Sequence, residues 1–89
     1  MELTGKKFRA KAWFKDQFAY YVIEFISNDQ AYLNHRLEDD TNITDRSLVN
    51  CQNIGDNNVM VMIDNKAYKG KITNDLLTFV GLPRNYFLY

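Results

Sequence analysis

The sequence contains few of the residues that mark several protein classes. Its 89 residues include one cysteine, one proline, one histidine and four glycines, and its acidic and basic side chains balance to zero net charge. The single Cys51 excludes an internal disulfide, and one proline with scattered glycines excludes a flexible or low-complexity linker. No apolar run approaches the ~20 residues of a membrane-spanning helix. We therefore predict one small domain, residues 1–89, without membrane association.

Chemical motifs are equally scarce. One histidine and one cysteine cannot supply the three or four nitrogen and sulfur ligands of a zinc site. The acidic residues 38–40 and Asp45 lack the spacing of a calcium loop, so we interpret them as a solvated polar loop. Nothing around His35 or Cys51 marks an activated nucleophile, and no Gly-rich loop suggests a nucleotide site. We expect a protein that is not an enzyme, with no catalytic residue, no metal site and no cofactor.

The first residues carry charge early and do not resemble a signal peptide. This feature predicts a cytoplasmic protein. A mature secreted domain with an added methionine is the alternative.

Against these absences stands a strong β pattern between residues 55 and 81. Three apolar runs, 58–63, 66–72 and 76–80, are separated by polar turns at Asp64-Asn65 and near residues 73–75. Within the first run, odd-numbered residues are Val or Ile and face one side, while two methionines face the other. Asp and Asn accept the positive φ of two-residue hairpin loops. The stretch is predicted to be a three-stranded meander.

The N-terminal part continues this alternation. Residues 6–15 carry lysines, Arg9 and Trp13 on one face and small or aromatic residues on the other, and residues 18–27 form the most apolar strand. Residues 28–38 fit either a strand or one short helix, because Leu33 and Leu37 satisfy both spacings, and position within a meander favours the strand. Weaker strands are predicted at 45–54 and 86–89.

Seven or eight short antiparallel strands make an all-β fold, either a small up-and-down barrel or a compact sandwich. Closure of a barrel would pair the last strand with the first and bury both sheet edges. The bulky aromatic residues predict an interior filled by side chains.

The order of these elements resembles the small lipocalin-like meander barrels of bacteria. The resemblance extends over nearly the whole chain and implies a fold, without any catalytic motif or function. It is carried by the patterns Leu3-x-Gly5-x-x-Phe8, Tyr21-x-Ile23-x-Phe25-x-Ser27-Asn28, Asn58-Val59-x-Val61-x-Ile63, Tyr68-x-Gly70-x-Ile72 and Leu77-x-Phe79.

The most suggestive functional feature is a basic and aromatic surface on the first strand. Exposed aromatic residues and arginine dominate protein interfaces, and lysines on an outer strand also protect against aggregation. Lys69, Lys71 and Arg84 would extend this surface in a closed barrel. The predicted interaction residues are Lys7, Arg9, Lys11, Trp13, Lys15, Phe18, Tyr20 and Tyr89.

Three binding functions compete on these grounds. The first is a small adaptor or inhibitor, of the kind that phages and mobile elements encode, which binds another protein or itself. The second is a single-stranded nucleic-acid binder that stacks bases on the aromatic residues of the Lys7–Lys15 face. The third is a carrier of a small apolar ligand inside the barrel.

Overall fold

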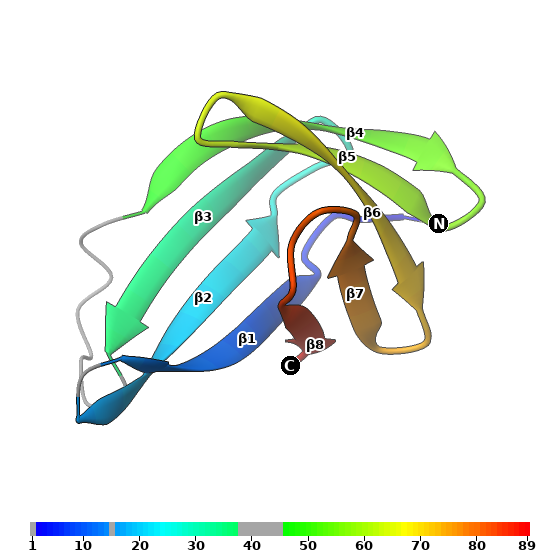
Figure 1. Ribbon diagram of the computed structural model, residues 1–89. Helices are drawn as coiled ribbons and strands as arrows, with labels where there is room; N and C mark the ends of the chain where they lie inside the picture. The colour runs from blue at the N-terminus through cyan, green and yellow to red at the C-terminus, as the bar shows by residue number, and fades with distance from the viewer. Residues whose placement is uncertain (1, 15, 38–45) are drawn as a thin grey trace.

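The computed structural model describes residues 2–14, 16–37 and 46–89. Within these residues the chain forms eight β-strands and no helix, and each strand pairs antiparallel with the next (Figure 1). β8 also pairs with β1, which closes the sheet into an up-and-down barrel. The strands are β1 (Lys7–Phe14), β2 (Gln17–Phe25), β3 (Gln30–Leu37), β4 (Ser47–Gly55), β5 (Asn58–Ile63), β6 (Lys66–Thr73), β7 (Leu76–Phe79) and β8 (Asn85–Leu88).

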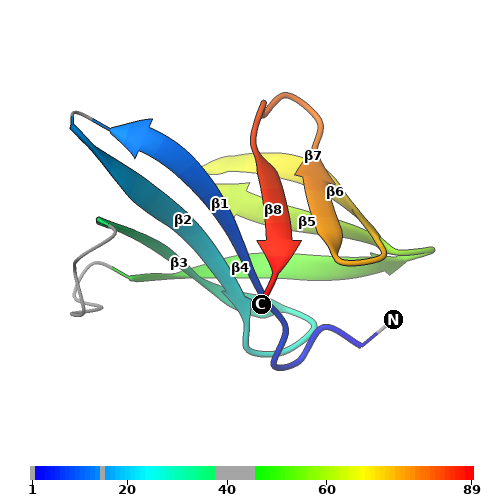
Figure 2. The same cartoon turned by 90° about the horizontal axis from the view of Figure 1, so that it is seen from below.

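This architecture confirms the all-β fold class, and of the two predicted arrangements the barrel is the one that forms. The predicted pairing of the last strand with the first is also confirmed, because β8 lies between β1 and β7 (Figure 2). At the level of the fold, a closed eight-stranded meander is consistent with the lipocalin-like barrels that the sequence resembles.

Tight turns of Asp and Asn set the register in the second half of the barrel. Asp64 and Asn65 both have positive φ, 53° and 64°, as the two-residue type I′ hairpin requires. Asp56 and Asn57 form the same kind of turn between β4 and β5, and Asn74 has a φ of 55° between β6 and β7. These short polar side chains tolerate the left-handed region, so the local sequence fixes which residues of β5, β6 and β7 pair.

Residues 30–37 form a strand, so the helix alternative for residues 28–38 is wrong within the described residues. The reason lies in the preceding turn. The Ser27 hydroxyl donates a hydrogen bond to Asp29 (2.6 Å) and accepts one from the Asp29 backbone N–H (3.3 Å). Ser27 therefore closes a turn between β2 and β3, and no helix begins there. Residue 38, and the predicted polar loop with Asp45, lie outside the described residues.

One end of the barrel is densely filled. The rings of Phe8 and Phe25 pack edge to face with centroids 6.1 Å apart. The side chain of Leu3 is completely buried, and its backbone N–H donates to the Asn28 side chain (3.2 Å). The N-terminal segment thus covers this end, and its apolar side chain adds to the core.

Among the described residues, the opposite end of the barrel is open. Along β5, Val59 and Val61 are buried but Ile63 is only half-buried, and along β3 exposure rises from the buried Ala31 to the exposed His35. The expectation of a completely filled interior is therefore wrong at this end. Several of the bulky aromatic residues are on the outer surface, whereas Ala10, Ala19, Ala31 and Gly70 contribute little volume to the interior.

Candidate functional site

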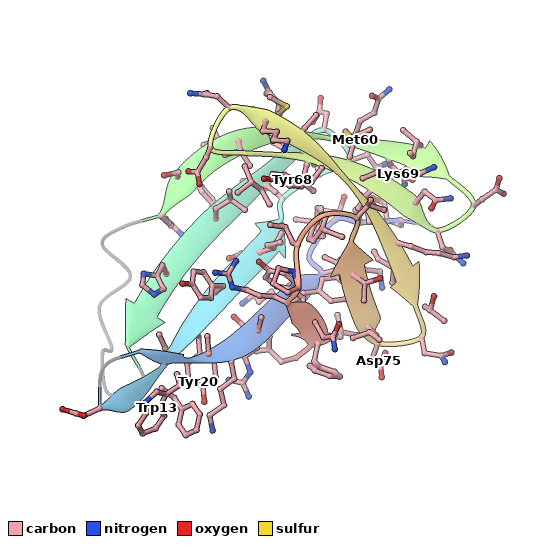
Figure 3. All side chains as sticks on the ribbon, in the orientation of Figure 1. Trp13, Tyr20, Met60, Tyr68, Lys69 and Asp75 are labelled. Atoms are coloured by element: carbon pink, nitrogen blue, oxygen red, sulfur yellow. The ribbon has the colours of Figure 1, made fainter. Side chains whose placement is uncertain are left out.

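The predicted interaction residues gather on one outer face of the barrel. The register of β1 and β2 places Lys11 across from Tyr20 and Trp13 across from Phe18. Figure 3 shows Trp13 and Tyr20 pointing to the same side, away from the barrel interior. β8 flanks β1 on the other side and adds two aromatic residues. We call this surface the basic-aromatic face; it consists of Lys7, Arg9, Lys11, Trp13, Phe18, Tyr20, Phe87 and Tyr89.

Cations on this face are held against aromatic rings. The Arg9 guanidinium carbon lies 5.0 Å from the centroid of the Tyr20 ring and 4.7 Å from that of Tyr89. The Lys11 ammonium lies 4.0 Å from the centroid of the Phe18 ring. Each contact attracts the cation to the electron-rich ring and limits its rotamers. The face is therefore ordered before any partner arrives, which lowers the entropic cost of binding.

Trp13 is the most exposed aromatic side chain of this face. It is 64% exposed, although its ring packs edge to face on Phe18 with centroids 4.8 Å apart. Phe87 and Tyr89 are also about half exposed. Large aromatic residues that remain exposed together on a small barrel mark a contact surface more often than isolated apolar residues do.

Seven of the eight predicted interaction residues lie on this face, and Lys15 lies outside the described residues. Phe87 was not among the predicted interaction residues. Its position next to the buried Tyr86 in β8 places it on the outer face, because neighbouring residues of a strand point to opposite sides. Lys69, Lys71 and Arg84 were predicted to extend this face. Arg84 lies next to it, but Lys69 projects from the opposite side of the barrel in Figure 3. β7 separates β6 from β8, the strand at the border of the face, which explains the difference.

Part of β1 has a free backbone edge beside this face. Only two residues of β1 pair with β8, and beyond them the Tyr89 N–H donates to the Lys7 carbonyl (3.0 Å). Backbone groups of alternate residues point to the same side of a strand, so those of Lys11 and Trp13 also face this edge. No residue of the described segments pairs with them there, and Figure 2 shows this end of β1 diverging from β8.

A groove follows from this divergence. It has a volume of about 600 Å³ and runs beside the free edge of β1. Its walls combine cations, aromatic rings and the bend before β8. The lining residues include Arg9, Lys11, Tyr20, Pro83, Arg84 and Phe87.

A second concave site is the open end of the barrel. This cavity has a volume of about 890 Å³, within the range of small-molecule sites. At its wall, the imidazole of His35 stacks on Tyr21 with ring centroids 4.5 Å apart and planes at 17°. The Arg84 guanidinium carbon lies 3.8 Å from the centroid of the same Tyr21 ring. Its lining is mixed, with slightly more polar than apolar surface.

Cys51 does not have the environment of a nucleophile. It is buried in the core, and burial, together with repulsion from Asp29, raises the pKa of its thiol to about 11. The thiol is therefore protonated at neutral pH, and catalytic cysteines need the thiolate. Among the described residues, no group of three His, Cys, Asp or Glu side chains is placed to hold a metal ion.

Comparisons with protein-family models, with curated proteins and with solved structures gave no significant match. In the described segments there is also no helix long and apolar enough to cross a membrane.

Proposed function

We propose that this protein is a non-catalytic binding module, an adaptor or inhibitor, that docks an extended acidic segment of a partner protein on its basic-aromatic face. The observation that carries the proposal is the coincidence of that face with the free edge of β1 at Lys11 and Trp13. A strand added to a free edge gains backbone hydrogen bonds, and its alternate side chains contact the flanking surface. The free backbone edge would thus provide affinity, and the neighbouring side chains of the face would provide selectivity.

Charge favours an acidic segment. The described residues of the face contribute Lys7, Arg9 and Lys11, and Arg84 lines the adjoining groove. Glu24 is directly across from Lys7 in the β1–β2 pairing and offsets part of this charge. The remaining positive potential would accelerate association with an acidic partner and discourage basic ones.

The ring contacts favour a protein over single-stranded nucleic acid. Base stacking needs accessible ring faces. Tyr20 and Tyr89 each have the Arg9 guanidinium over the ring, and Phe18 has Lys11 over its ring. Arg, Tyr and Trp are also the residue types that most often dominate the free energy of protein interfaces.

Protection against aggregation is the competing explanation for lysines on an edge strand. Trp13 does not fit this explanation, because its side chain is 64% exposed and adds an apolar surface that favours association at the same edge. A strand whose only role was to prevent pairing with other molecules would not carry an exposed tryptophan.

The test uses two substitutions at one position. Lys11→Pro removes the charge and also the backbone N–H at the free edge, whereas Lys11→Gln removes the charge alone. Proline is tolerated on an edge strand where its missing N–H faced solvent, so both variants are expected to fold, which circular dichroism would verify. Octapeptides selected from a randomised display library against the wild type supply the probe.

We expect selected peptides that are acidic and alternate apolar with polar residues. Their affinity should fall modestly for Lys11→Gln and by a further factor of about five or more for Lys11→Pro, since a lost hydrogen bond costs roughly 1 kcal/mol. Equal binding by the two variants would overturn the proposal, as would failure to enrich acidic peptides.

Two further outcomes would replace the proposal. Trp13 is the sole tryptophan, so quenching of its fluorescence by a short single-stranded oligonucleotide, reversed by moderate salt, would show a nucleic-acid site. A dimer in sedimentation velocity that Lys11→Pro disrupts would identify a second copy as the occupant.

A further inference from the structure

We infer that the open end of the barrel is a binding site for an aromatic carboxylate, with Arg84 as the group that receives the carboxylate. The inference does not rest on the proposed function, because it concerns the interior of the barrel, although Arg84 lines both sites. It rests on the shape of the cavity, on the way Arg84 is held and on the residues that line the rest of the site.

Arg84 is held at the wall of the cavity by an aromatic ring. Its guanidinium carbon lies 3.8 Å from the centroid of the Tyr21 ring, and its positive charge acts against the rise that burial causes in the pKa of Tyr86. No carboxylate of the described residues forms an ion pair with it, although Asp64 lines the same cavity. A guanidinium held against an aromatic ring has lost part of its rotamer freedom. It therefore needs little further ordering to bind a carboxylate with two parallel hydrogen bonds.

The rest of the cavity fits an aromatic body. Tyr21, Tyr68 and His35 line it, and Tyr21 and His35 already form a stacked pair. Offset stacking and edge contacts favour planar ligands over flexible chains, because a rigid ring loses no internal freedom on binding. Apolar contacts are supplied by Leu33, Val49, Ile63 and Leu82.

The dimensions support a single small ligand. The cavity of about 890 Å³ lies within the 300–1,000 Å³ range typical of ligand sites, and an eight-stranded barrel is wide enough to hold one small ligand. Within the described residues, the filled core closes the other end of the barrel, so a ligand would enter from the open end.

The experiment compares two ligands of nearly the same shape, 2-naphthoate and 2-naphthamide, by NMR titration of the full chain after removal of any affinity tag. The chain has one histidine and one tryptophan. The ring signals of His35 therefore report occupancy of the cavity, and the indole N–H signal of Trp13 reports contact with the basic-aromatic face. No resonance assignment is needed to separate the two sites.

We expect saturable shifts of the His35 signals with 2-naphthoate, without a matching shift of the Trp13 indole. The uncharged amide should bind about 10- to 100-fold more weakly, the range for a lost hydrogen bond to a charged group. Arg84→Gln should reduce the affinity for 2-naphthoate by a similar factor and leave that for 2-naphthamide nearly unchanged. Lys11→Gln, which removes a cation from the outer face, should change neither affinity.

Equal affinity for the two ligands would overturn the inference, as would absence of a saturable His35 shift. Shifts confined to the Trp13 indole would place the ligand on the outer face and overturn it also. If Arg84→Gln does not fold, the ligand pair on the wild type remains decisive. Val49→Phe, which narrows the cavity while retaining Arg84, should also abolish binding.

Discussion

Gly70 in β6 is directly across from Phe79 in β7, and the Phe79 ring occupies the space that a side chain at Gly70 would need. A β-carbon at position 70 would lie 2.8 Å from the ring and 3.1 Å from the Leu77 side chain. All three residues are buried inside the barrel. Gly70 is thus the small partner that allows a large aromatic residue to face inward here.

Gly70→Ala should lower the free energy of unfolding by about 1–3 kcal/mol, the usual penalty for overpacking a core. Urea denaturation followed by circular dichroism measures it. In a Phe79→Leu background the same substitution should cost less, because the smaller side chain leaves room for the methyl group. An equal penalty in both backgrounds would show that backbone conformation, and not the ring, requires glycine.

Leu3 is the residue that ties the N-terminal segment to the core. Its side chain is completely buried, so Leu3→Ala should destabilise the protein by about 2–5 kcal/mol. Leu48→Ala makes the same chemical change on a side chain that is 54% exposed and should cost less than about 0.5 kcal/mol. Similar unfolding midpoints for the two variants would mean that the N-terminal segment contributes little to the barrel.

Most of the fold could be predicted because local sequence patterns determine the strands and turns. Alternation identifies each strand, and the Asp64-Asn65 pair specifies both the turn and the register of β5 and β6. Residues 28–38 could not be decided locally, since Leu33 satisfies helical and strand spacing alike. Leu33 pairs with Ile23 in β2, and this contact between two strands selects the strand conformation.

The basic-aromatic face and the cavity also differ in how far local sequence patterns predict them. The basic-aromatic face follows from alternation within β1, so most of its residues could be found in the sequence. Tyr21 and His35 are cross-strand partners in the β2–β3 pair, but Arg84 comes from the bend before β8, and only closure of the barrel brings it to Tyr21. No local pattern marks Arg84 as a residue that would face the open end.

Asn34 carries a side-chain oxygen that is buried without a hydrogen-bond partner among the described residues. Its strand neighbour in β2 is the buried Val22. An unpaired buried carbonyl costs about 1–3 kcal/mol, so Asn34→Val should raise the free energy of unfolding by roughly 1 kcal/mol. Valine also has the higher strand propensity. A loss of stability in thermal or urea unfolding would show that the amide makes a contact worth more than its desolvation.

Cys51 should make the stability of the protein depend on pH in the alkaline range. Burial raises the pKa of the thiol from its ordinary value of 9.0 to about 11. The unfolded chain then releases this proton at a lower pH than the folded chain does. The protonated thiol therefore favours the folded state fully below pH 9, and this contribution is lost as the pH rises from 9 towards 11.

The measurement compares wild type with Cys51→Val, in reducing buffer, by urea denaturation between pH 7 and pH 10.5. The stability of the wild type relative to the variant should be constant up to about pH 9 and should fall above it. Burial also raises the pKa of Tyr86, but that residue is present in both proteins, so its contribution cancels in the comparison. A difference that stays constant to pH 10.5 would mean that the thiol titrates alike in the folded and unfolded chains, contrary to its burial between β3 and β5.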